Sequence, residues 1–288
     1  MRLFLTIILV LLVSCKNSGQ SKKESFINLN GNKIHVKTSG NGRPIIFVHG
    51  GYLDLEMWNS QIMELKDTYQ TIRFSDLGHG KTISSKKPIF GYDIINELTN
   101  KYPYDKFVLV GLSWGAMLSV DFALNYPDKV DKLILVSPGL NGWTYFQDSI
   151  ASRNNKLRQK SIEDSDTLKA AKLFHQNWVI GPRRKKSDLD SRFYVHSLEM
   201  ITKTMRKHKL ENWSQLDTIP AITRLENIQP KTYIIIGRED ATDILLIAEE
   251  YHKRINHSKK IELDSVAHLL NMETKAKFNR ILKEILDE

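Results

Sequence analysis

The amino-acid sequence predicts an α/β fold that is built on a mostly parallel sheet. From about residue 26 onward, short apolar runs alternate with helical patterns, and this alternation is typical of parallel strands joined by helices. The apolar runs are continuous rather than alternating in polarity, which indicates strands that are buried on both faces of the sheet.

The predicted elements begin with a hairpin and then alternate between strand and helix. Asn30-Gly31-Asn32 separates the β-rich runs 25–30 and 33–38, and Asn-Gly tolerates the positive φ of a tight turn. The remaining strands are expected at 44–48, 71–75, 107–110, 133–136, 233–236 and 261–263. The helices are expected at 57–65, 92–102, 116–126, 244–255 and 274–286.

The composition excludes several classes of protein. The chain has 288 residues, so one large domain, or one domain with an insertion, is expected. Hydrophobic residues make up 41% and charged residues 26% of the chain, which excludes a disordered or multi-pass membrane protein. Because Cys15 is the single cysteine, a disulfide framework and a cysteine-based zinc or iron–sulfur site are excluded as well.

The N-terminus is predicted to be a targeting signal rather than a part of the fold. The apolar run Leu3–Val13 would rise only about 16 Å as a helix, which is too short to cross a membrane but suits a signal peptide. Leu12-Val13-Ser14-Cys15 resembles the bacterial lipobox, in which cleavage before the cysteine leaves it lipidated. The resemblance implies a signal peptide over 1–14, a lipid anchor on Cys15 that attaches the protein to a membrane of the bacterial cell envelope, and a polar tether over 15–24. An ordinary signal peptide with an unmodified cysteine is the alternative.

One long interval interrupts the alternation of strands and helices. No apolar β-run occurs in residues 139–222, which are predicted to form a helical cap inserted into a core of 25–138 and 223–288. The cap holds 15 Lys and Arg against 9 Asp and Glu, so it carries +6 of the chain's net charge of +9. Its densest basic cluster, 183–186, is interpreted as a solvated loop in preference to a site for anionic substrates or lipids.

Two further interpretations concern the cap. No nucleic-acid-binding motif accompanies the positive charge, so no nucleic-acid partner is expected. Trp143, Trp178 and Trp213 either line a pocket or form the core of the cap, and the sequence pattern leaves both readings open.

The sharpest motif is Gly111-Leu112-Ser113-Trp114-Gly115, which matches G-x-S-x-G between a predicted strand and a predicted helix. In that setting the serine sits on a strained turn with its hydroxyl exposed. Side chains at the two glycine positions would collide with the neighbouring strand and helix. Ser113 is therefore the candidate nucleophile, and a serine that only caps the following helix is the alternative.

A serine nucleophile needs a histidine that removes its proton and a carboxylate that orients the histidine. Asp240 and His268 each follow a predicted strand, so the chain order is serine, acid, histidine. This order and the motifs resemble those of the α/β-hydrolase superfamily over both segments of the core. The resemblance implies a catalytic triad of Ser113, Asp240 and His268. It favours Asp240 over Glu239 and Asp243, because the family's acid usually stands at that distance from its strand.

The resemblance also implies the groups that hold the negative charge of the transition state. In the family, one backbone amide after a His-Gly pair and another after the nucleophile point at this oxyanion. They correspond here to Gly51 and Trp114, with Tyr52 as the alternative to Gly51. Each such donor is worth about 3 kcal/mol in the transition state.

Together these residues predict a serine hydrolase that transfers the acyl group of a small-molecule ester or amide substrate to water, with an ester preferred. No organic cofactor and no metal is required. A proline iminopeptidase-like exopeptidase is the alternative, because that family also has a Ser-Trp-Gly elbow; its H-G-G-P-G loop reads H-G-G-Y-L here. Haloalkane dehalogenases and epoxide hydrolases resemble the fold but use an Asp at the position of Ser113. A second alternative is a non-catalytic, membrane-tethered binding protein on the same scaffold.

Overall fold

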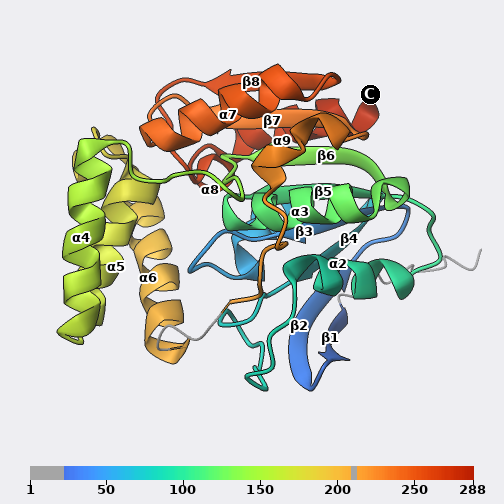
Figure 1. Ribbon diagram of the computed structural model, residues 1–288, viewed down its shortest axis with the longest axis horizontal. Coiled ribbons are helices and arrows are strands. Elements are labelled where there is room, and N and C mark those ends of the chain that lie inside the picture. The colour runs from blue at the N-terminus through green and yellow to red at the C-terminus, as the bar shows by residue number, and fades with distance from the viewer. Residues whose placement is uncertain (1–22, 209–212) are drawn as a thin grey trace, which may run out of the picture.

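The computed structural model describes residues 23–208 and 213–288, in which eight strands form one sheet with helices on both faces (Figure 1). The strands are β1 (Lys23–Leu29), β2 (Asn32–Ser39), β3 (Arg43–Val48), β4 (Tyr69–Phe74), β5 (Phe107–Leu112), β6 (Val130–Val136), β7 (Lys231–Gly237) and β8 (Ser258–Leu263). Their order is β1-β2-β4-β3-β5-β6-β7-β8, and every adjacent pair is parallel except the two that include β2. The predicted α/β fold with a mostly parallel sheet is confirmed.

The hairpin β1–β2 starts two residues earlier than the predicted core. Its turn has positive φ angles at Asn30 (51°) and Gly31 (81°), as a two-residue hairpin turn requires. Lys23 and Glu24, which the sequence pattern assigned to the tether, pair with β2. The sequence pattern did not predict a strand here because both residues are polar. One side of an edge strand faces water, so such a strand accepts charged residues.

Helices cover both faces of the central strands. On one face lie α2 (Gly91–Asn100), α3 (Trp114–Asn125) and α7 (Thr242–Arg254), and on the other lie α1 (Asn59–Leu65) and α9 (Lys275–Asp287). Within β3, Ile46 belongs to the first core and Phe47 to the second. Because both faces of the sheet are buried, the sequences of these strands are continuous apolar runs.

Between β6 and β7 the chain forms three helices that stand beside the sheet (Figure 1). They are α4 (Ser149–Glu163), α5 (Thr167–His175) and α6 (Ser191–His208). Each of them starts after an aspartate whose side chain accepts backbone N–H groups of the first turn, Asp148 for α4, Asp166 for α5 and Asp190 for α6. The remaining short helix is α8 (Leu270–Glu273), and the short helical turns are η1 (Leu55–Trp58), η2 (Pro127–Lys129), η3 (Gln176–Ile180), η4 (Lys186–Asp188), η5 (Ala221–Thr223) and η6 (Leu225–Asn227).

The segment that returns from α6 to β7 lies on the core rather than among the cap helices. The backbone of Gln215 exchanges hydrogen bonds with Ile89 and Gly91, at 2.8 and 2.9 Å. The backbone N–H of Asp217 donates to the carboxylate of Asp121 on α3 at 2.8 Å. Residues 213–222, which the sequence pattern grouped with the cap, therefore pack against the core.

No helix of the described ranges is long and apolar enough to span a membrane. The predicted signal peptide, Cys15 and most of the predicted tether lie outside the described residues.

Candidate active site

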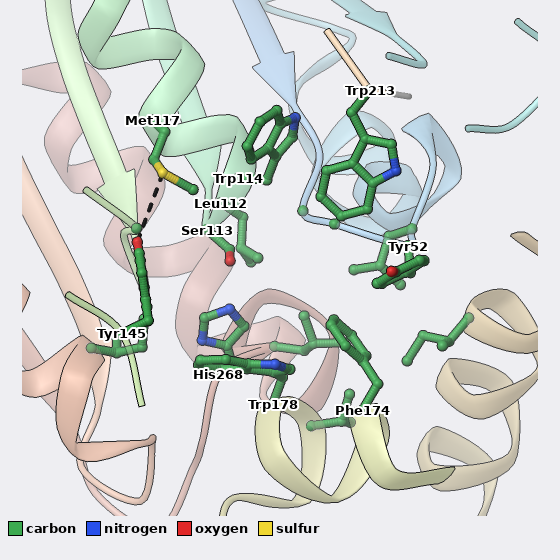
Figure 2. A pocket seen from close by; sticks show the side chains of 18 of the residues that line it. Tyr52, Leu112, Ser113, Trp114, Met117, Tyr145, Phe174, Trp178, Trp213 and His268 are labelled. Atoms are coloured by element: carbon green, nitrogen blue, oxygen red, sulfur yellow. Dashed lines mark hydrogen bonds between the residues drawn. The ribbon is translucent and has the colours of Figure 1, made fainter. Parts of the chain in front are cut away.

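A cavity of about 280 Å³ lies between the carboxyl ends of the central strands and the cap. Small-molecule sites usually measure roughly 300–1,000 Å³, so this one suits a small ligand. Its walls are mostly apolar and aromatic, and both Ser113 and His268 line it. Figure 2 shows these two side chains in the middle of the cavity.

Ser113 occupies a strained turn between β5 and α3. Its φ and ψ are 55° and −111°, a conformation that costs a non-glycine residue energy. A Cβ on Gly111 would lie 2.4 Å from the carbonyl oxygen of Gly115, and one on Gly115 would lie 2.3 Å from that of Val48. Although Ser113 precedes α3, its side chain makes no capping hydrogen bond, so helix capping does not explain the serine.

His268 is oriented by Asp240. The ring nitrogen Nδ1 lies 2.8 Å from the Asp240 Oδ2, and both side chains are almost completely buried. A carboxylate only accepts hydrogen bonds, so Nδ1 carries the proton and Nε2 remains available as a base. The second oxygen of Asp240 accepts the backbone N–H of Ala241 at 2.7 Å, which holds the carboxylate in place.

The hydroxyl of Ser113 points toward the ring of His268 (Figure 2). No hydrogen bond joins these two side chains in this arrangement. Catalytic hydrogen bonds are often long in the absence of substrate and tighten when it binds. Trp178 packs against the ring of His268, with 5.2 Å between ring centroids, and restricts its movement.

Asp243 and Glu239, the alternatives to Asp240 as the orienting acid, are not bonded to His268. Asp243 accepts hydrogen bonds from Trp143 Nε1 at 3.2 Å and from the backbone N–H of Phe146 at 3.0 Å. It thereby ties the chain that enters the cap to the start of α7. Of Asp240, Asp243 and Glu239, Asp240 is the one bonded to His268.

The backbone amides of two cavity-lining residues have no acceptor within the described part of the chain. They belong to Gly51, in the turn after β3, and to Trp114, the first residue of α3, where helical N–H groups lack an intrahelical partner. The amide of Tyr52 is engaged, because it donates to Nε2 of His79 at 3.1 Å. Of the two candidates in this turn, Gly51 therefore has the free donor.

Two buried histidines shape the turn that carries Gly51. His49 accepts the backbone N–H of Asp76 at Nε2, and His79 accepts that of Tyr52. Each ring uses Nδ1 to donate to a carbonyl oxygen, at 2.8 and 2.7 Å. Burial lowers the pKa of His49 and places the pKa of His79 well below its ordinary value, so both rings stay neutral and keep one acceptor nitrogen.

The cap contributes part of the cavity wall. Trp178 lines the cavity from the cap and Trp213 from the segment that packs on the core, whereas Trp143 donates to Asp243 and packs against the core. The sequence left these roles open because helical periodicity does not reveal which neighbour an aromatic side chain meets. Tyr52 stands edge-to-face against Trp213 and against Phe174 of α5, at 5.0 and 4.9 Å between centroids.

The basic cluster 183–186 is only partly solvated, contrary to the sequence interpretation. Arg184 forms a two-point ion pair with Glu273, and the two side chains are 8% and 11% exposed. Arg183 donates to the backbone carbonyl oxygen of Asp240 at 2.7 Å and pairs with Asp148. The cluster therefore joins the cap to the loops that carry the acid and the histidine. These partners lie far along the chain, so charge patterning could not reveal them.

Sequence reasoning missed Arg158 and the side-chain contribution of Tyr52. Both line the cavity, and the guanidinium Nη1 donates to the Tyr52 hydroxyl at 3.2 Å. In the sequence, Arg158 is one of 15 basic residues of the cap, and nothing in its neighbours distinguishes it. Among the described residues, no group of three or more His, Cys, Asp or Glu could hold a metal ion.

Comparison with known proteins agrees with the fold. The family model for the alpha/beta hydrolase fold matches residues 43–275. A cis-3-alkyl-4-alkyloxetan-2-one decarboxylase of Shewanella oneidensis is 30% identical over 129 residues, 41% of this chain and 39% of that protein. A soluble epoxide hydrolase of a Corynebacterium species is 30% identical over 120 residues, 39% of this chain and 41% of that protein. These matches thus span about two fifths of the relatives' own length.

A solved esterase structure from Exiguobacterium antarcticum superposes with a TM-score of 0.75 at 20% identity, covering 92% of this chain and all of that one. At this identity the likeness concerns the fold. The family model, by contrast, spans most of the chain and includes the strand–serine–helix turn. The chain therefore belongs to the α/β-hydrolase fold family of enzymes.

Proposed function

We propose that this protein is a serine hydrolase that cleaves a small carboxylic ester with Ser113, His268 and Asp240 as its triad. One observation carries the proposal: Asp240 orients His268 at the wall of a cavity that also holds the strained Ser113 and two unbonded amides. A nucleophile, a base with its orienting acid, and oxyanion donors are the parts that acyl transfer needs.

The reaction proceeds in two halves. Ser113 Oγ forms a bond to the carbonyl carbon while Nε2 of His268 takes the hydroxyl proton, and the amides of Gly51 and Trp114 hold the oxyanion. The intermediate collapses, the alkoxide leaves, and His268 returns the proton to it. Water, deprotonated by His268, then attacks the acyl-serine; the bond to Ser113 Oγ breaks, His268 returns the proton to that oxygen, and the acid is released.

The charge of the cavity favours an ester over an N-terminal peptide. An exopeptidase that removes an N-terminal residue must accommodate the ammonium group of its substrate next to the scissile bond. Of the described residues that line the cavity, none is Asp or Glu, and Arg158 is a cation. An ammonium group would be repelled there, so the iminopeptidase-like alternative is disfavoured.

The chemistry of serine also favours an ester over an epoxide. A carboxylate nucleophile that opens an epoxide leaves an ester, which water can hydrolyse. A serine that did so would leave an ether, which activated water does not cleave. Ser113 therefore fits a carbonyl substrate, although one relative is named as an epoxide hydrolase.

The test combines covalent labelling with a substrate series. A fluorophosphonate probe should label the wild-type protein and spare Ser113→Ala, with Ser119→Ala, a buried serine of α3, as the matched control that keeps the label. Nitrophenyl esters of increasing acyl length are then compared with amino-acyl anilides. Turnover of the esters supports the proposal. An unlabelled, folded wild-type protein that hydrolyses none of these compounds would instead indicate a non-catalytic binding protein.

The proposal extends to a lipid anchor on Cys15 that holds the enzyme at a membrane of the bacterial cell envelope. The Leu-Val-Ser-Cys sequence after an apolar run supports it. When the full chain is expressed in bacteria, mass spectrometry should find residue 15 at the mature N-terminus with acyl chains attached. Cys15→Ser should move the protein from the membrane to the soluble fraction, whereas Ser21→Ala should not. A wild-type protein without acyl chains contradicts this part of the proposal.

A further inference from the structure

We propose that the substrate of this site carries a carboxylate in addition to the scissile ester, and that Arg158 binds it. This inference rests on the proposed ester hydrolysis and adds the substrate class. It starts from Arg158, the one Lys, Arg, Asp or Glu among the described residues that line a mostly apolar and aromatic cavity.

The hydrogen bonds of Arg158 leave part of its guanidinium unused. Nε and Nη2 donate to the side-chain oxygen of Asn155 at 3.2 and 2.9 Å, and Nη1 donates to the Tyr52 hydroxyl at 3.2 Å. A guanidinium has five N–H groups, so two of them, one on each terminal nitrogen, have no acceptor in the described chain. The three existing bonds hold the group in a defined orientation, which lowers the cost of binding a ligand.

Arg158 also has no carboxylate partner among the described residues, unlike its neighbours in the cap. Arg183 pairs with Asp148 and Arg184 pairs with Glu273. Arg158, which is half-buried, is bonded only to the neutral Asn155 and Tyr52. Removing a cation from water without a counter-charge is unfavourable, and an anionic ligand that brought the counter-charge would relieve this cost.

Arg158 lies on one side of the cavity, away from the bond that Ser113 would attack. Figure 2 shows Tyr52, Phe174 and Trp213 on one side of Ser113, and Met117 and Tyr145 on the other. Because Arg158 is bonded to the hydroxyl of Tyr52, its cation lies on the side of Tyr52. A substrate can place its ester at Ser113 and its carboxylate at Arg158, with its hydrocarbon skeleton against the aromatic rings. Arg158 is thus a residue that determines specificity.

Pairs of esters that differ in charge test the inference. Monomethyl adipate and methyl hexanoate compare an anionic with a neutral acyl chain. 4-Acetoxybenzoate and phenyl acetate compare an anionic with a neutral leaving group. The wild type should prefer the anionic member of at least one pair by about 10- to 100-fold in kcat/KM, the range of a charge-assisted two-point hydrogen bond. The preferred pair identifies which product carries the carboxylate.

The decisive variant is Arg158→Met, which keeps the length of the side chain and removes its charge. It should lose the preference, because kcat/KM should fall by much more for the anionic esters than for the neutral ones; Arg158→Lys should retain part of the preference. Arg153→Met is the matched control, because Arg153 is exposed on the same helix and does not line the cavity. It removes the same charge from the cap and should keep the full preference.

A binding measurement makes the inference independent of catalysis. In Ser113→Ala, calorimetry should find that 4-acetoxybenzoate or monomethyl adipate binds at least tenfold tighter than its neutral counterpart, and Arg158→Met in that background should abolish the difference. Hydrolysis without any preference for the anionic esters would overturn the role of Arg158 and leave the proposed function intact. If the protein hydrolyses none of these esters but still binds the anionic ones selectively, the proposed function fails and the role of Arg158 stands.

Discussion

His79 accepts the backbone N–H of Tyr52 at its Nε2, 3.1 Å away, and thereby holds the turn whose preceding residue, Gly51, lines the cavity. Tyr52 has a positive φ of 57°, so the turn is held in a conformation that a side chain disfavours. The neutral imidazole supplies the acceptor that this conformation needs. His79, a loop residue remote from the proposed triad in sequence, therefore holds the turn that carries one of the two proposed oxyanion donors.

We predict that His79→Ala lowers kcat on a nitrophenyl ester by about 10- to 100-fold, with a smaller change in KM. The Tyr52 amide loses its acceptor and the Gly51 amide moves from the oxyanion, and loss of one such donor costs about 10²- to 10³-fold. Steady-state kinetics, with active sites counted by the fluorophosphonate probe, measure the effect. His79→Gln, whose side-chain carbonyl can accept the same N–H, should recover part of the activity. An unchanged kcat in His79→Ala would show that the contact does not position the donor.

Asp240→Asn is expected to lower kcat by about 10³- to 10⁴-fold. The amide favours the wrong tautomer of His268 and no longer stabilises the imidazolium that forms during catalysis. KM should change little, because Asp240 lies behind the histidine and does not line the cavity. The neighbouring acid provides the control: Glu239→Gln should retain activity within about twofold. Equal losses in the two variants would remove Asp240 from the triad.

The ion pair between Arg184 and Glu273 should matter for stability more than a surface pair does. Arg184→Met leaves the Glu273 carboxylate, which is only 11% exposed, without its partner, and this should cost about 2–3 kcal/mol of the free energy of unfolding, below the roughly 3–5 kcal/mol of a fully buried pair. The double variant Arg184→Met/Glu273→Leu should recover most of this loss. Arg192→Met, at an exposed pair, should change the free energy by less than about 1 kcal/mol. Urea unfolding measures all three, and a loss in Arg184→Met no larger than in Arg192→Met would contradict the prediction.

Asp121 gives the stability a pH dependence. Burial on α3 raises the pKa of its carboxyl to about 6, whereas an unfolded chain releases that proton near 3.9. The folded state therefore binds the proton more tightly, and this contribution to stability is present below about pH 4 and lost as the pH rises to about 6. Asp121→Asn should raise Tm relative to wild type more at pH 8 than at pH 4.5, by about 2–4 °C.

The control for this prediction is Asp128→Asn, a nearby exposed aspartate whose replacement should shift Tm equally at the two pH values. Calorimetric melting of the three proteins at pH 4.5 and 8 gives the comparison. A Tm difference between Asp121→Asn and wild type that is the same at both pH values would mean that the buried carboxyl does not keep its proton.

Much of the fold and of the candidate site follows from local sequence. The strands β3 and β5 read as continuous apolar runs because both faces of the sheet are dry. Gly111 and Gly115 mark the turn of Ser113 because a Cβ at either position would strike backbone atoms. Asp240 and His268 could be chosen because each follows a predicted strand, in the order and at the positions that the resemblance to the α/β-hydrolase superfamily implies.

What the tertiary structure decided is how distant segments meet. Arg184 of the basic cluster pairs with Glu273, almost 90 residues further along the chain, and residues 213–222 pack on the core rather than among the cap helices. Trp178, Trp213 and Arg158 reached the cavity while Trp143 did not. Local pattern sets which residues are apolar, charged or strained. The face that a cap helix presents depends on how it packs against the sheet, and that packing comes from contacts between residues far apart in sequence.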